Sequence, residues 1–412
     1  MEFQEYLTRY ASLIVRHGLN VQRGQKVNLA GEAAHREFLY LIARECYALG
    51  ALYVNIDLIE PRLSRLRVES STEEQMKYVP GFITPKYLEI LESGGANLRI
   101  VGPEDPDILR GLDPKKINTG RIAGYQAIKP FYDDGIGKSK VHWTVAAAAT
   151  KGWAKRIFPG EPEDRVEMLL WDQIFKICRV DHQDCLERWK KHNAMLQERA
   201  RRLTDLRIKT LHFRGPGTDL RVGLSELALF KGGGDVGPHG VEYEPNIPTE
   251  ECFTTPDWRL TEGRVRATRP FFINGTLIKG LEIEFKQGEI VSFEAAEGLE
   301  TFREYIGIDP GGKRLGEVAL VGIDSPVYQS GLVFEEILFD ENAACHIAVG
   351  SAYKFCLKGG NTLSSEELSS IGCNESSVHT DMMISSEQVD VEAQTYDGRS
   401  VSLISRGQWT KI

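Results

Sequence analysis

The sequence has no long hydrophobic run, no excess of positive charge and no closely paired cysteines, and each absence excludes a class of protein. No stretch of 18 apolar residues occurs, so we expect no membrane span. The formal net charge of −9 argues against a protein that binds nucleic acid by neutralising phosphates. The first residues, Met1–Tyr6, lack a basic region followed by an apolar core, so we expect no secretory signal. The seven cysteines form no CxxC pair, which predicts reduced thiols and a cytoplasmic protein.

Phosphate-binding motifs are also missing. No glycine fingerprint follows the first expected strand, and no Gly-Lys-Ser/Thr sequence occurs. The glycine-rich run 232–235 lacks the lysine and serine of a phosphate cradle, so we interpret it as a flexible loop. Cys345, Cys356 and Cys373 match no standard zinc spacing and are better explained as small buried residues. A dinucleotide-binding function is therefore not favoured.

The N-terminal part of the chain alternates helical and strand patterns. With 412 residues, of which 42% are hydrophobic and 26% charged, the chain can form two or three globular domains. Phe3, Tyr6, Tyr10 and Ile14 recur at helical spacing and predict an opening helix. Further strands are expected at 26–30, 51–58, 97–101 and 140–147, with helices near 33–49 and 85–91. Strands separated by helices predict parallel βαβ units, so we expect an N-terminal α/β domain over 1–160.

The remainder of the chain has a different pattern. Apolar residues at helical spacing from Leu186 to Leu203 predict a helical connector over 161–205. Short strands then follow, with turn signals at Asn274-Gly275 and Gln287-Gly288; the strands are expected at 208–213, 220–222, 280–285 and 289–293. We therefore expect a strand-rich α+β domain over 206–412. All candidate catalytic residues fall in this domain.

The stretch Ser377–Ile384 is the most informative in the chain. It is typical of a short strand, and it carries His379 and Asp381 two residues apart. Side chains at i and i+2 of a strand share one face, so these two groups should project together. An imidazole beside a carboxylate is half of a divalent-metal site. The motif is common by itself, so its weight depends on the rest of the chain.

Three other segments carry acidic residues among small or apolar ones. They are Pro248–Pro256 with Glu250 and Glu251, Leu315–Leu320 with Glu317, and Asp340–Gly350, which holds Glu341 and His346 and is followed by Tyr353. A buried carboxylate needs a cation or a hydrogen-bond network, whereas the plainer interpretation of each segment alone is that the carboxylate faces solvent. Several such segments in one half of the chain favour a shared site.

In order and spacing these segments resemble the metallo-aminopeptidase family that includes aminopeptidase T, aminopeptidase S and PepS, peptidase family M29. The most specific matches are Asn246–Glu251, Leu315–Glu317, Glu341–Tyr353 and Ser377–Asp381. The resemblance implies a site with two divalent metal ions per subunit, ligated by Glu251, Glu317, His346, His379 and Asp381. It also implies that Glu341 and Tyr353 lie in or beside that site. Glu250 is the residue most easily confused with Glu251.

The ligand set agrees with hydrolysis assisted by two metals. Two Glu, one Asp and two His suit zinc, cobalt or manganese and tolerate magnesium, and the sequence does not choose among them. Paired cations can clamp the attacking water and the scissile carbonyl. We expect Glu317 to bridge them, Glu341 or Glu250 to carry the proton to the leaving amine, and Tyr353 to donate a hydrogen bond to the oxyanion.

The resemblance therefore implies an enzyme that releases N-terminal amino acids from short peptides and forms a homodimer whose site faces an enclosed cavity. Two alternatives remain open at this stage. One is a different amidase or hydrolase that uses the same two metals. The other is a non-catalytic binding protein on the same scaffold.

Overall fold

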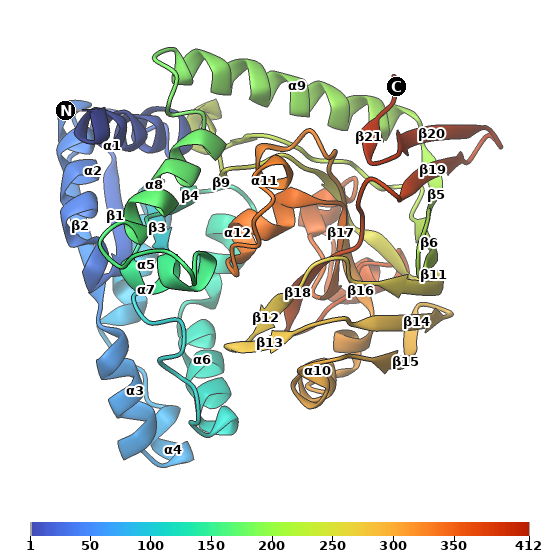
Figure 1. The fold of residues 1–412 in the computed structure, drawn as a ribbon, viewed down its shortest axis with the longest axis horizontal. Helices are drawn as coiled ribbons and strands as arrows, with labels where there is room; N and C mark the ends of the chain where they lie inside the picture. The colour runs from blue at the N-terminus through green and yellow to red at the C-terminus, as the bar shows by residue number, and fades with distance from the viewer. Residues whose placement is uncertain (1, 412) are drawn as a thin grey trace. The chain divides into compact units, whose positions relative to one another are not determined.

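The computed structural model describes residues 2–411, and the described chain forms two compact units (Figure 1). The N-terminal unit extends to Lys190 and also includes Gly234–Pro248, and the C-terminal unit comprises Lys191–Gly233 and Thr249–Ile412. Along the chain, the first boundary between the units falls inside helix α9 (Cys185–Asp205). The three-part division expected from the sequence stays a prediction.

The N-terminal unit is built on a five-stranded sheet. Its strand order is β2-β1-β3-β4-β9, and every neighbouring pair is parallel. The strands are β1 (Lys26–Glu32), β2 (Tyr53–Ile59), β3 (Ala96–Val101), β4 (His142–Ala147) and β9 (Asn246–Ile247). The parallel βαβ pattern predicted from the sequence is confirmed, and strand β9 is contributed by a segment about 100 residues further along the chain.

Helices supply the apolar partners of this sheet. Helix α2 (Arg36–Ala48) follows β1 and buries Phe38, Leu39 and Ile42. Helices α1 (Glu2–Leu13) and α8 (Val166–Ile177) pack aromatic side chains together, with the ring centroids of Tyr6 and Phe175 5.6 Å apart, and Tyr10 of α1 stacks on Phe38 of α2 at 5.5 Å. This burial of large rings gives the unit a core of its own.

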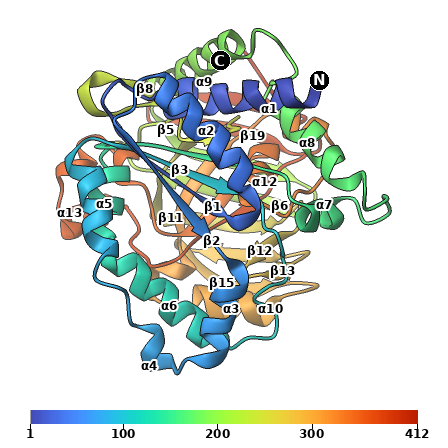
Figure 2. The same cartoon turned by 90° about the vertical axis from the view of Figure 1, so that its left-hand side faces the viewer.

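The α-helices that lie between β2 and β4 along the chain are labelled in Figure 2. They are α3 (Pro61–Ser70), α4 (Glu73–Met76), α5 (Ile83–Glu92) and α6 (Pro114–Ala127). Helix α6 buries none of its residues, and several large apolar side chains on or beside these helices are exposed, among them Leu63, Leu66, Tyr78, Phe82 and Ile122.

Besides the two-stranded sheet of β12 (Phe271–Ile273) and β13 (Thr276–Ile278), the C-terminal unit contains two antiparallel sheets. The larger has the order β15-β14-β11-β6-β5-β19-β20-β21. Its strands are β5 (Ile208–Gly215), β6 (Thr218–Leu224), β11 (Pro256–Arg266), β14 (Glu282–Lys286), β15 (Glu289–Glu294), β19 (Asp390–Thr395), β20 (Ser400–Ser405) and β21 (Gln408–Trp409). The predicted fold class, an α/β unit followed by a strand-rich unit, is confirmed.

The smaller sheet has the order β10-β16-β17-β18. It comprises β10 (Cys252–Thr254), β16 (Leu315–Leu320), β17 (His346–Gly350) and β18 (His379–Met383). Every residue of β16 and β17 is buried, which is why these short segments are almost continuously apolar. Their few polar side chains therefore lie inside the protein.

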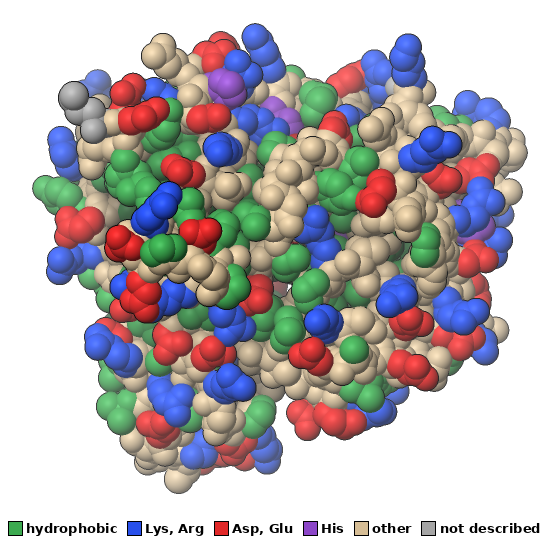
Figure 3. Space-filling model, in the orientation of Figure 1, with side chains coloured by type: hydrophobic (Ala, Val, Ile, Leu, Met, Phe, Trp, Pro, Cys, Tyr) green, Lys and Arg blue, Asp and Glu red, His purple; other side chains and the backbone are tan. Residues whose placement is uncertain are grey.

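No helix among residues 2–411 is long and apolar enough to cross a membrane. On the face drawn in Figure 3, the acidic and basic side chains of the described residues are interspersed rather than gathered by sign.

Candidate metal centre

The smaller sheet of the C-terminal unit brings the five expected ligands onto one face. Glu317 of β16 and Asp381 of β18 both lie opposite Ala348 of the central strand β17. Directly opposite residues share a face, as do residues two apart, so His346 and His379 point the same way. The methyl group of Ala348 leaves space between the larger side chains. Strand register thus gathers groups that are up to 64 positions apart in the sequence.

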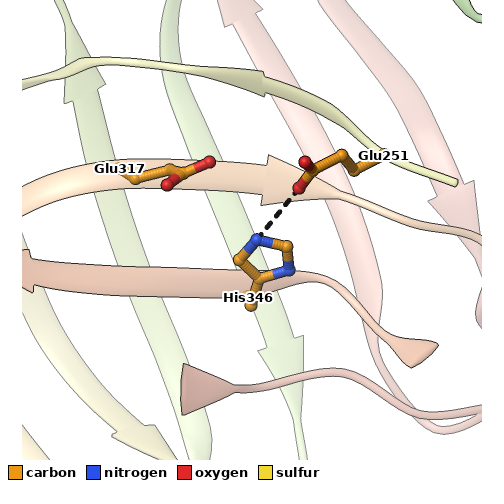
Figure 4. A group of neighbouring side chains, drawn as sticks. All are labelled: Glu251, Glu317 and His346. Atoms are coloured by element: carbon orange, nitrogen blue, oxygen red, sulfur yellow. Dashed lines mark ion pairs between the residues drawn. The ribbon is translucent and has the colours of Figure 1, made fainter. Parts of the chain in front are cut away.

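The fifth residue, Glu251, enters from the neighbouring strand. It directly precedes β10, whose Cys252 lies opposite Leu320 of β16. Figure 4 shows its carboxylate directed at the His346 ring, with Glu317 on the adjacent strand. The Oε2 atom of Glu251 is 3.1 Å from Nε2 of His346.

The five side chains form two overlapping groups that share Glu317. In the first, ligand atoms of Glu251, Glu317 and His346 all lie within 4.8 Å of one another, and in the second the same holds for Glu317, His379 and Asp381. Nε2 of His379 lies 3.3 Å from Oε2 of Glu317 and 3.7 Å from Oδ1 of Asp381.

Both imidazoles are held with Nε2 turned towards the carboxylates. Nδ1 of His379 is 2.8 Å from the carbonyl oxygen of Ser351, and Nδ1 of His346 is 3.2 Å from that of Ala344. A carbonyl oxygen only accepts, so each Nδ1 carries the proton that it donates. In the neutral ring, Nε2 then has a lone pair free for a cation, which is the usual arrangement of metal-ligating histidines.

The carboxylates of the site lie close enough together to shift the pKa values of one another and of the imidazoles. Burial, with the charges of Asp381 and Glu251, raises the pKa of Glu317 to about 7. Burial and the neighbouring Glu251 and Asp381 hold the pKa of Glu341 well above its usual range. Burial lowers the pKa of the His346 imidazole, but Glu251 and the other carboxylates outweigh it and keep that pKa high. Four carboxylates so close together repel one another unless cations or protons intervene.

The donor set fits divalent cations. While the His346 ring is neutral, with its one proton on Nδ1, the buried Oε2 of Glu251 has no hydrogen-bond donor among the described residues. A buried carboxylate oxygen without a donor is costly, whereas a cation between it and Nε2 would satisfy both atoms. Oxygen and imidazole ligands suit zinc, cobalt, manganese and magnesium.

The three residues expected to act in catalysis are placed differently from one another. The hydroxyl of Tyr353 is 3.5 Å from Nε2 of His379. The Thr255 hydroxyl accepts the backbone N–H of Tyr353 and donates to the carbonyl oxygen of the same residue. Glu341 begins the short 3₁₀ helix Glu341–Ala343, and burial together with the charges of Glu251 and Asp381 raises its pKa. The carboxylate of Glu250 is directed at His192 rather than at the group around Glu251; Oε2 of Glu250 lies 3.5 Å from Nε2 of His192.

Sequence reasoning missed two residues that support this site. His192 of α9 is buried and bonds the carbonyl oxygen of Thr249 at 2.7 Å. Asn342 is fully buried; its Oδ1 accepts the Glu250 N–H at 2.7 Å and its Nδ2 donates to Leu338 O at 2.9 Å. His192 lies in a helix whose charge pattern indicates only a solvated face, so nothing local singles it out.

Comparison with known proteins gives matches over nearly the whole chain. The family model described as thermophilic metalloprotease (M29) matches residues 3–409. Aminopeptidase PepS of Streptococcus thermophilus is 38% identical over 99% of this chain and 98% of its own length. Aminopeptidase T of Thermus thermophilus is 39% identical over 99% of both chains. The solved structure titled wild-type AmpT from Thermus thermophilus superposes with a TM-score of 0.92 at 38% identity, covering 99% of this chain and 100% of that one.

Proposed function

The chain belongs to the M29 family of thermophilic metalloproteases, and we propose that it releases N-terminal amino acids from short peptides with two divalent metal ions. Membership of this family, together with relatives named aminopeptidases at 36–39% identity, makes it a metallo-aminopeptidase. The observation that carries the finer proposal is the pair of ligand groups that share Glu317.

Two ions fit the site better than one. Each group supplies one imidazole and one carboxylate of its own, and Glu317 is common to both, which suits a bridging ligand. Glu251, Glu317, Glu341 and Asp381 together carry four negative charges when ionised, which two divalent cations balance. We therefore assign Glu251 and His346 to one ion, His379 and Asp381 to the other, and Glu317 to both. When bound, such ions polarise a carbonyl and lower the pKa of water from 15.7 towards ~7.

The protein's own residues then handle the proton and the developing charge. As the water oxygen bonds to the carbonyl carbon, Glu341 takes the water proton, and it returns a proton to the amine nitrogen when the C–N bond breaks. A carboxylate can accept and return the proton, and Glu341 lies beside Glu251 and Asp381. The Tyr353 hydroxyl donates a hydrogen bond to the former carbonyl oxygen. We favour Glu341 over Glu250 as the proton carrier because the Glu250 carboxylate faces His192.

The test compares aminoacyl-p-nitroanilides with their N-acetylated forms before chelation, after chelation, and after add-back of zinc, cobalt, manganese or magnesium. We expect hydrolysis of the free-amine substrates alone, lost on chelation and restored by at least one metal. Equal cleavage of the acetylated substrates would identify a different amidase. A well-folded protein with bound metal and no hydrolysis at all would favour a binding protein on this scaffold.

We also propose that the protein acts as a cytoplasmic homodimer. Two-fold dimers are the commonest assemblies, and the apolar side chains exposed on the helices between β2 and β4 provide a surface for one. Seven free thiols, all of them buried, agree with a reducing compartment. An enclosed site between two subunits would restrict substrates to short peptides.

A further inference from the structure

His379 lies at a weakly supported point of the sheet. It is the first residue of β18, and β18 is an edge strand that pairs with β17 alone. Residues 371–378, directly before it, form no helix or strand. The first residue of an edge strand opens more easily than one in a central strand. A ligand at this point therefore needs support from outside the sheet.

That support comes from helix α10 (Leu299–Ile306). The hydroxyl of Tyr305 accepts the backbone N–H of His379 at 3.1 Å and donates to the carbonyl oxygen of the same residue at 2.8 Å. A phenol has one proton and two lone pairs, so it makes both bonds at once. One hydroxyl thus holds both backbone polar groups of a single residue.

A second contact from the same segment holds the preceding loop. Asp309 accepts the hydroxyl of Ser376 at 2.7 Å, and the N–H and hydroxyl of Ser377 at 2.7 and 2.6 Å. These bonds keep the pKa of Asp309 below its usual range despite partial burial. Residues 305–309 therefore fix the chain on both sides of Val378.

We propose that Tyr305 is a positioning residue that sets the metal affinity of the group formed by Glu317, His379 and Asp381. The inference rests on the proposed function, because it assumes that this group binds a metal. With its backbone held by Tyr305 and its Nδ1 by Ser351, His379 can present Nε2 in only one place. Without the Tyr305 hydroxyl, the backbone of His379 would be less ordered in the metal-free protein, and metal binding would have to bear the entropy cost of ordering it. Glu251 and His346 enter from other strands and should be affected much less.

The experiment measures zinc binding to the metal-free full-length protein by competition with a chromophoric chelator. We expect two binding steps for the wild type. In Tyr305→Phe, one step should weaken by roughly 10–100-fold, the usual effect of removing a group that orients a ligand, while the other stays within about threefold. Tyr396→Phe is the matched control, since it removes another hydroxyl that donates to a backbone carbonyl, Leu224 O at 2.8 Å.

The possible outcomes separate the inference from the proposed function. Wild-type protein that binds none of zinc, cobalt, manganese and magnesium would overturn the proposed function, and the inference with it. Two unchanged steps in Tyr305→Phe would overturn the inference alone, and so would equal weakening of both steps, because general loosening produces that result. Should Tyr305→Phe not fold, Asp309→Asn decides, with the same selective weakening expected and unchanged binding as the contrary result.

Discussion

Glu317 is the residue on which both candidate metal groups depend. In Glu317→Gln the neutral amide cannot bridge two cations, so we expect both ions to bind weakly and kcat/KM to fall by at least ~100-fold. Burial already raises the pKa of this carboxyl group to about 7, so a neutral side chain should not lower the stability of the metal-free protein. Thermal unfolding of the metal-free form separates this loss of function from misfolding. Near-normal turnover in the variant would contradict the assignment.

Asp340 gives the second prediction, and it concerns stability. Burial raises its pKa to about 7, although it accepts the backbone N–H groups of Phe334 and Glu336. Between about pH 4 and pH 7 the folded chain therefore keeps a proton that the unfolded chain releases, and stability falls as the pH rises through this range. Asp340→Asn has no such proton to lose. The difference between the Tm of the variant and that of the wild type should increase from pH 4.5 to pH 7.5, and a constant difference would show that Asp340 does not titrate in this range.

At the scale of single residues, the sequence predicts which side chains close together in the chain share a face, but not which distant residues form hydrogen bonds. The two-residue spacing of His379 and Asp381 predicted that they share a face, and Nε2 of the first lies 3.7 Å from Oδ1 of the second. Nothing near Tyr305 in the sequence indicates a bond to His379, which is 74 positions away. Such pairs depend on how a helix docks beside a strand, which local patterns do not encode.

At the scale of elements, turns and strands were the easier predictions. The dipeptides Asn274-Gly275 and Gln287-Gly288 adopt positive φ at all four positions, as the tight turns between antiparallel strands require. Helix α6 was missed because it buries no residue and so has no apolar periodicity. Its start was nevertheless signalled by Asp113, whose side chain accepts the Lys115 N–H, followed by Pro114.

Gly350 at the end of β17 lies opposite His379 and supplies the third prediction. Its φ is +103°, and an added Cβ would lie 2.0 Å from the carbonyl oxygen of Val378. We expect Gly350→Ala to lower the free energy of unfolding by roughly 3 kcal/mol or more and to weaken metal binding, because β17 and the chain at Val378 must separate.

The control for this prediction is Gly398→Ala. Gly398 also has positive φ, +87°, but nothing lies within 4 Å of an added Cβ. In Gly398→Ala the free energy of unfolding should fall only by the cost of the backbone strain, about 1–2 kcal/mol. Urea unfolding of both variants isolates the steric effect, and equal losses would show that contact with Val378 is unimportant.

At the scale of the whole molecule, the proposed homodimer gives the fourth prediction. Light scattering after size exclusion should yield twice the mass of the chain. Phe82→Glu places a charge on an exposed apolar surface of the N-terminal unit and should shift the protein towards monomer. Leu260→Glu, at an exposed position of the C-terminal unit, is the matched control. A wild-type protein that is monomeric at micromolar concentration would exclude the proposal.

Sequence patterns predicted the class of each unit because parallel and antiparallel sheets impose different periodicities. The family was identified from four short segments, and the match over residues 3–409 confirms it. The path of the chain between the units was not predictable. The run 232–235 was interpreted as a flexible loop, and nothing in its composition indicates that the chain rejoins the first sheet just beyond it.

The late strand β9 has a consequence for synthesis and for any attempt to divide the protein. Because Asn246 and Ile247 pair with β4, the N-terminal sheet stays one strand short until the ribosome has released almost 250 residues. In a fragment that stops at residue 205, β4 would be an unpaired edge strand, and its free backbone N–H and C=O groups would be a template for aggregation. Gene fusions or split reporters should therefore keep residues 1–248 on one polypeptide.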